Sequence, residues 1–145
     1  MKRNGRANLL LILAAVGIVA ILGLLLFSKG TPSQAASEFL VALAKGDVKK
    51  LTDLSFMDGD TPEEIEKKWT YTTQVVGPHY RFVWKMVGES VVDPQTASVR
   101  LQFVRNALSP SPYEENFALP MVNKDGKWKV DVRAISREMY PGLPR

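Results

Sequence analysis

The sequence predicts an α+β domain that follows an N-terminal transmembrane helix, with three helices packed on a curved antiparallel sheet of about four strands. Three observations predict this class. An uninterrupted apolar run covers residues 9–27. Helical spacing of apolar residues then extends to about residue 71, and the alternation typical of strands follows from residue 80. Short turns join the strands, which indicates antiparallel neighbours, because parallel pairs need long crossovers.

The apolar run, residues 9–27, predicts a transmembrane helix. It holds no charged or strongly polar side chain, and at about 1.5 Å per residue it reaches roughly 28 Å, close to the hydrocarbon thickness of a bilayer. Lys2, Arg3 and Arg6 precede the run. A basic excess on this flank predicts a cell-membrane protein with a cytoplasmic N-terminus, residues 1–8, and an extracytoplasmic C-terminal domain.

The competing interpretation of this run is a signal peptide that is cleaved near Ser33-Gln34-Ala35. The apolar region of a signal peptide is usually about 7–15 residues long, which is shorter than this run. Residues 28–31 form only a short linker before the next predicted helix. We therefore expect an uncleaved anchor with the domain close to the bilayer.

The charge of the chain excludes a simple nucleic-acid-binding function. The formal net charge is +4, and all 15 acidic residues lie beyond residue 29. Lys2, Arg3, Arg6 and Lys29 account for the whole excess, so the domain itself is formally neutral. A nucleic-acid partner would need a basic face on the domain. The chain contains no cysteine, which excludes disulfides, thiolate metal sites and a cysteine nucleophile.

Two sequence signals predict the starts of helices. Thr31-Pro32-Ser33-Gln34 and Thr61-Pro62-Glu63-Glu64 each place Thr at the N-cap, Pro at the first helical position and Gln or Glu at the third. The first helix would end at Lys45-Gly46, and Asp47 would cap a short second helix. The third would run to about Tyr71, and Gly77-Pro78 interrupts the pattern.

Strand patterns occupy the second half of the chain. Residues 80–92 are rich in β-branched and aromatic side chains, with Gly88 indicating a bulge. Residues 96–105 alternate between apolar and polar, and the alternation resumes around residues 117–121. Residues 123–126 read as a hairpin turn before the last strand, and residues 134–145 as an irregular tail to which we assign no role.

Two motifs resemble a known superfamily. They are Ala36-x-x-Phe39-Leu40-x-Ala42-Leu43-x-Lys45-Gly46-Asp47 with Leu51-x-x-Leu54, and Pro120-Met121-Val122-x-x-Asp125-Gly126-Lys127-Trp128-Lys129-Val130-Asp131. Together they resemble membrane-anchored bacterial domains of unknown function in the nuclear-transport-factor-2-like, cystatin-like superfamily, over residues 32–133. The resemblance implies a cone-shaped domain with a space between sheet and helices. In some relatives this space holds a ligand or an active site, and in others it is filled.

Five side chains are candidates for a pocket or an interface. His79, the only histidine, precedes the first long strand, and as a general base it would need a partner that the spacing does not reveal. Arg100 could point into a pocket or to solvent. Trp69 and Trp84 fit core positions, although Phe82 and Trp84 lie on a strand that is apolar on both faces, which would suit a dimer surface. We assign no catalytic residue, no cofactor and no metal ligand.

The sequence thus favours a non-catalytic, extracytoplasmic interaction domain on a single-pass anchor. Its partners would be a second copy bound through the sheet face, or an envelope protein. The alternative is a binder of a small hydrophobic molecule between sheet and helices. An isomerase or dehydratase is the third hypothesis, and it is disfavoured because the core-facing strand positions are apolar.

Overall fold

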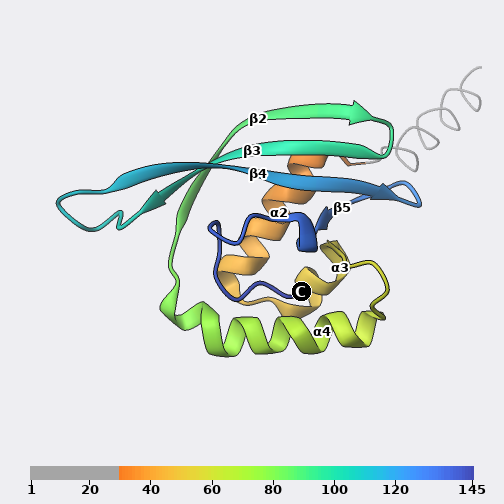
Figure 1. Ribbon diagram of the computed structural model, residues 1–145, viewed down its shortest axis with the longest axis horizontal. Helices are drawn as coiled ribbons and strands as arrows, with labels where there is room; N and C mark the ends of the chain where they lie inside the picture. The colour runs from red at the N-terminus through yellow and green to blue at the C-terminus, as the bar shows by residue number, and fades with distance from the viewer. Residues whose placement is uncertain (1–29) are drawn as a thin grey trace, which may run out of the picture.

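The computed structural model describes residues 30–145, which form a curved sheet with helices on one side (Figure 1). The elements in order are α2 (Pro32–Lys45), α3 (Val48–Leu54), β1 (Ser55–Phe56), α4 (Pro62–Tyr71), the π-helical turn η1 (Thr72–Val76), the 3-10 turn η2 (Gly77–His79), β2 (Val83–Asp93), β3 (Thr96–Arg105), β4 (Tyr113–Lys124), β5 (Lys127–Asp131) and the 3-10 turn η3 (Val132–Ala134). The anchor expected at residues 9–27 lies outside the described residues. Within residues 30–145, no helix combines the length and apolar character needed to cross a bilayer.

The three predicted helices begin at their predicted caps. Thr31 accepts a hydrogen bond from the Gln34 amide at 3.2 Å, and the Thr31 amide donates to the Gln34 side chain at 3.0 Å. Thr61 and Glu64 form the same pair of bonds at the start of α4. These bonds satisfy amides that a helix start leaves without partners. At its other end α2 stops at Gly46, where φ is +70°, a conformation that suits glycine.

The sheet has five strands in the order β1-β5-β4-β3-β2. Strands β2 to β5 form the predicted antiparallel meander. The prediction of about four antiparallel strands missed β1, in which Ser55 pairs in parallel with Val130 of β5. A strand of two residues cannot show alternation, and its partner is distant in the sequence. The predicted bulge at Gly88 is confirmed, because the register between β2 and β3 shifts between Met86 and Gly88.

The core lies between the concave face of the sheet and the helices. Val99, Leu101 and Phe103 of β3 are fully buried there. The segment after η3, expected as a tail beyond the domain, contributes to the same core. Its buried side chains are Ile135, Met139, Tyr140 and Leu143. This segment, residues 135–145, is irregular in conformation and is called the C-terminal segment below.

Asp60 joins the loop before α4 to the end of the sheet. Its carboxylate lies 2.6 Å from Lys68 Nζ and 3.0 Å from Arg133 Nη2. Arg133 also donates a hydrogen bond to the Asp58 carbonyl. Met57 in this loop is buried, and only 13% of the Asp60 side chain is exposed. The loop is therefore fixed to the domain by charged hydrogen bonds.

We expect Asp60 to make the stability of the domain depend on acidic pH. The Lys68 hydrogen bond, together with the charge of Arg133, holds the pKa of the Asp60 carboxyl below its ordinary value of 3.8. Such a group stabilises the folded state above that ordinary value, and this stabilisation is lost as the pH falls through the lower folded-state pKa. Urea denaturation between about pH 5 and 2 should therefore show a shallower loss of stability in Asp60→Asn than in the unaltered chain.

Asp58→Asn is the matched control for this prediction, because Asp58 is exposed in the same loop. It should follow the unaltered chain across the whole acidic range. Equal slopes for Asp60→Asn and the unaltered chain would contradict the assignment.

Candidate functional site

The space in which the resemblance implies a pocket is filled by aromatic side chains. Phe39 from α2, Trp69 from α4, Phe103 from β3 and Tyr140 from the C-terminal segment are all fully buried or nearly so. Trp69 donates from Nε1 to Ser55 Oγ at 2.9 Å, which satisfies its polar atom in the core. The candidate residue Trp69 is thus placed in the core.

Phe82 and Trp84 pack against this core from the β2 side. The Phe82 ring stacks on the Phe103 ring, with centroids 5.0 Å apart and planes 8° apart. The Phe82 and Tyr140 rings form a T-shaped pair with centroids 5.7 Å apart. The Trp84 and Phe82 ring centroids lie 5.5 Å apart, and both side chains are partly buried. Such aromatic pairs add stability beyond the buried area. These two candidates therefore extend the core toward the sheet edge.

Arg105 fastens the C-terminal segment to the sheet. Its Nε lies 2.7 Å from Glu115 Oε2 on β4. Its Nη2 donates to the carbonyls of Glu138 and Met139 at 2.8 and 2.7 Å. Charged hydrogen bonds of this kind are stronger than neutral ones. The sequence did not indicate this role of Arg105, because the two carbonyls that it binds lie 33 and 34 residues away along the chain.

His79 and Arg100 lie in different places and do not form a common site. His79 is exposed at the end of η2 and lines a shallow depression of about 380 Å³ with Arg105 and Glu115 among its neighbours. Arg100 lies on the outward face of β3, where its guanidinium covers Gly88 so closely that a Cβ there would collide with it.

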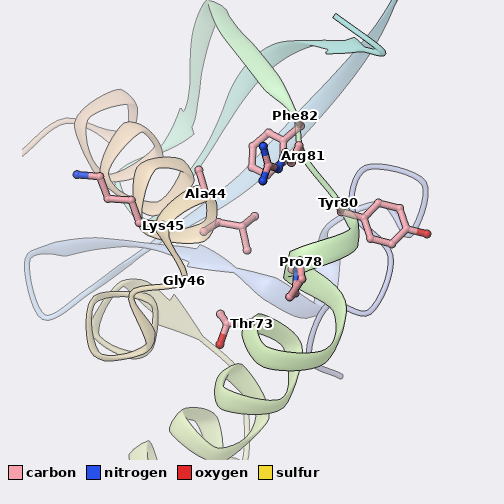
Figure 2. Close-up of a pocket in the computed structure, with 10 residues that line it drawn as sticks. Ala44, Lys45, Gly46, Thr73, Pro78, Tyr80, Arg81 and Phe82 are labelled. Atoms are coloured by element: carbon pink, nitrogen blue, oxygen red, sulfur yellow. The ribbon is translucent and has the colours of Figure 1, made fainter. Parts of the chain in front are cut away.

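An open cleft of about 540 Å³ lies between the end of α2 and the η1–η2 turn (Figure 2). Lys45, Arg81 and Tyr80 contribute polar groups to its lining, and the lining residues include no carboxylate. In Figure 2 the Lys45 ammonium and the Tyr80 hydroxyl point to opposite sides, away from one another. The cleft therefore offers two cations but no acid–base pair, and its polar groups do not converge.

Metal-ligating side chains do not gather in the part of the chain that the structure describes. Among residues 30–145, no group of three or more His, Asp or Glu side chains lies close enough to hold an ion.

The comparisons with known proteins identify the fold. No protein-family model matches the chain, and no curated protein matches it in sequence. A solved structure of an uncharacterised protein with a cystatin-like fold from Caulobacter vibrioides is 12% identical, with a TM-score of 0.50, over 68% of this chain and 80% of that one.

Two further solved structures are similar to this chain at lower scores. A domain of unknown function with a cystatin-like fold from Nostoc punctiforme has a TM-score of 0.48 and 11% identity, over 68% of this chain and 69% of that one. A nuclear-transport-factor-2-like protein of unknown function from Shewanella oneidensis has a TM-score of 0.44 and 11% identity, over 68% of this chain and 89% of that one. The likeness to the Caulobacter vibrioides protein shows that the domain has a cystatin-like fold.

Proposed function

We propose that this chain is a single-pass membrane protein that presents a non-catalytic interaction domain outside the cytoplasm. The observation that carries the proposal is the filled interior of the domain. Ligand and active sites are usually concave pockets with a few converging polar groups. Here Phe39, Trp69, Phe103 and Tyr140 occupy that space. The contacts of such a domain lie on its outside.

The edge strand β2 offers a surface for a partner. This strand exposes Val83, Met86 and Val87. Exposed apolar side chains gathered on one element are typical of interaction surfaces. A second copy of the chain bound through the sheet, or an envelope protein, would suit this surface.

Single introduced thiols test the membrane topology, because the chain has no cysteine of its own. Leu108→Cys places a thiol on the fully exposed β3–β4 connection. In spheroplasts it should react with a membrane-impermeant maleimide, whereas Asn4→Cys should react only after the membrane is permeabilised. The chain should also stay in the membrane pellet at alkaline pH and keep its N-terminal mass.

A protected Leu108→Cys thiol in spheroplasts, or release of the chain at alkaline pH, would contradict the proposal. A mature chain that begins near residue 35 would instead establish the cleaved signal peptide.

The open cleft favours a second candidate function, which is the binding of a small molecule. Its volume of about 540 Å³ falls within the usual range of ligand pockets, about 300–1,000 Å³. Arg81 and Lys45 would favour an anion there. A small molecule that stays with the purified chain in native mass spectrometry, and is lost in Arg81→Ala but kept in Lys67→Ala, would support this function.

A further inference from the structure

Three segments meet at one end of the domain. Ser33, in the first turn of α2, donates from its amide to Glu89 Oε2 on β2 at 2.9 Å. The Asn123 amide donates to the Gln95 carbonyl at 2.8 Å, which joins the β2–β3 turn to the end of β4. The start of α2 and both hairpin turns therefore lie at the same end of the sheet, and Figure 1 shows them together there. We call this the α2 end.

Two adjacent valines are exposed at the α2 end. Val91 is 55% exposed and Val92 is 74% exposed. The register between β2 and β3 shifts between Val91 and Asp93, so Val92 lies in a bulge and has no partner opposite it.

The turn that follows the valines is held by hydrogen bonds of its own. The Asp93 carboxylate accepts from the Gln95 amide at 2.7 Å and from the Thr96 amide at 2.9 Å. The turn thus keeps an apolar tip in a fixed, exposed position.

The linker limits how far the α2 end can lie from the membrane. Only residues 28–30 separate the apolar run, residues 9–27, from the N-cap Thr31. At about 3.5 Å per residue, the fully extended chain from residue 27 to residue 31 spans roughly 14 Å. The headgroup region on each side of a bilayer is about 5–8 Å thick. With the run in the bilayer, Thr31 therefore lies at most about 6–9 Å beyond the headgroup region. The α2 end is thus held close to the membrane surface.

We infer that the α2 end rests on the lipid bilayer, with Val91 and Val92 inserted among the lipids. The inference depends on the membrane anchor of the proposed function. Lys124 and Lys127 at this end are accompanied by Asp93 and Asp125, so the charges balance. The contact is apolar, requires no anionic lipid, and fixes the orientation of the domain so that the β3–β4 connection points away from the membrane.

A fluorescent reporter at the α2 end tests the contact. Gln95→Cys keeps the backbone bonds of the turn, and its thiol can carry an environment-sensitive nitrobenzoxadiazole group. The full chain is placed in phosphatidylcholine vesicles. We expect the emission to be shifted to the blue. Nitroxide-labelled lipids should quench it, whereas iodide should not. The spectral shift should be the same in 1 M salt. Leu108 belongs to the β3–β4 connection, which lies at the opposite end of the sheet (Figure 1). The same label on Leu108→Cys should be quenched by iodide alone.

The double variant Val91→Ser/Val92→Ser identifies the residues that make the contact. Both positions are exposed, so the domain should fold unchanged. The Gln95→Cys label should then lose at least half of its spectral shift and become open to iodide.

Two results would overturn the inference. In the first, the chain resists alkaline extraction, but iodide quenches the label on Gln95→Cys as strongly as the label on Leu108→Cys. The other is a spectral shift that persists in the double serine variant or disappears in 1 M salt. A chain that leaves the vesicles at alkaline pH would overturn the anchor itself, and this result is distinct from the first two.

Discussion

Trp69→Ala should lower the free energy of unfolding by about 3–5 kcal/mol, the usual cost of truncating a large buried aromatic side chain. Trp69 is fully buried. Its ring meets Phe39 of α2 edge-on, with centroids 5.7 Å apart. Its Nε1 donates to Ser55 Oγ, and Ser55 in turn donates to the Leu51 carbonyl at 2.6 Å. One side chain thus connects α4 to α2, α3 and β1, and its removal leaves a cavity that all four elements border.

Tyr71→Ala is the matched control for this prediction. Tyr71 lies two residues further along α4 and is 64% exposed, so its truncation should change stability by no more than about 0.5 kcal/mol. Trp69→Phe should fall between the two, since it keeps a ring but loses the bond to Ser55. Urea denaturation of the purified full chain measures all three. Equal stabilities of the two alanine variants would show that Trp69 does not hold the helices on the sheet.

The helices could be predicted because their signals are local. The Thr31 and Thr61 hydroxyls accept hydrogen bonds from backbone amides three residues further along the chain. Each complete capping signal is therefore contained in four consecutive residues. The alternation in residues 96–105 likewise needs only the strand itself. Helix caps and strand alternation depend only on residues that are close together in the sequence. For this reason the α+β class could be predicted.

What could not be predicted depends on distant partners. β1 is a strand only because Ser55 pairs with Val130. The C-terminal segment follows no period, because Met139 and Tyr140 enter the core from irregular backbone. The Glu138 and Met139 carbonyls of this backbone bind Arg105. Residues 134–145 therefore read as a tail, although they complete the core.

The two-sided apolar pattern of β2 has a structural explanation that the sequence showed only in part. A bulge reverses which face successive residues occupy. Before Gly88, Trp84 lies opposite Phe103 on the core side. Beyond it, Glu89 lies opposite Val99 on that side and binds the start of α2. Gly88 indicated the bulge, but the partners of the two halves of the strand come from elsewhere in the chain.

Tyr140→Ala should destabilise the domain by about 3–5 kcal/mol, as expected for a large buried ring. Tyr140 is 2% exposed, and its ring lies 5.7 Å from Phe82 and 5.9 Å from Tyr80. The variant should open an apolar cavity beside Phe82 and Phe103. Xenon or benzene binding, which stabilises a protein with such a cavity, should raise the urea midpoint of Tyr140→Ala and leave that of the unaltered chain unchanged.

Tyr140→Phe is the matched control, because it keeps the ring and removes only the hydroxyl. Burial, with a smaller effect from Tyr80, raises the pKa of the Tyr140 phenol above its ordinary value of 10.0. The folded state therefore disfavours the phenolate, and the unaltered chain should lose stability as the pH rises above about 10. Tyr140→Phe should lack this part of the alkaline loss while remaining within about 1.5 kcal/mol of the unaltered chain at neutral pH.

The Tyr140 variants also decide between surface contact and the binding of a small hydrophobic molecule between sheet and helices. If the C-terminal segment is part of the core, Tyr140→Ala costs several kcal/mol and the interior of the unaltered domain has no room for a ligand. If Tyr140→Ala leaves stability unchanged, the C-terminal segment does not stabilise the core and can move out of the interior. The space beside Phe103 would then be free to receive an apolar molecule, and small-molecule binding would replace surface contact as the better account of this domain.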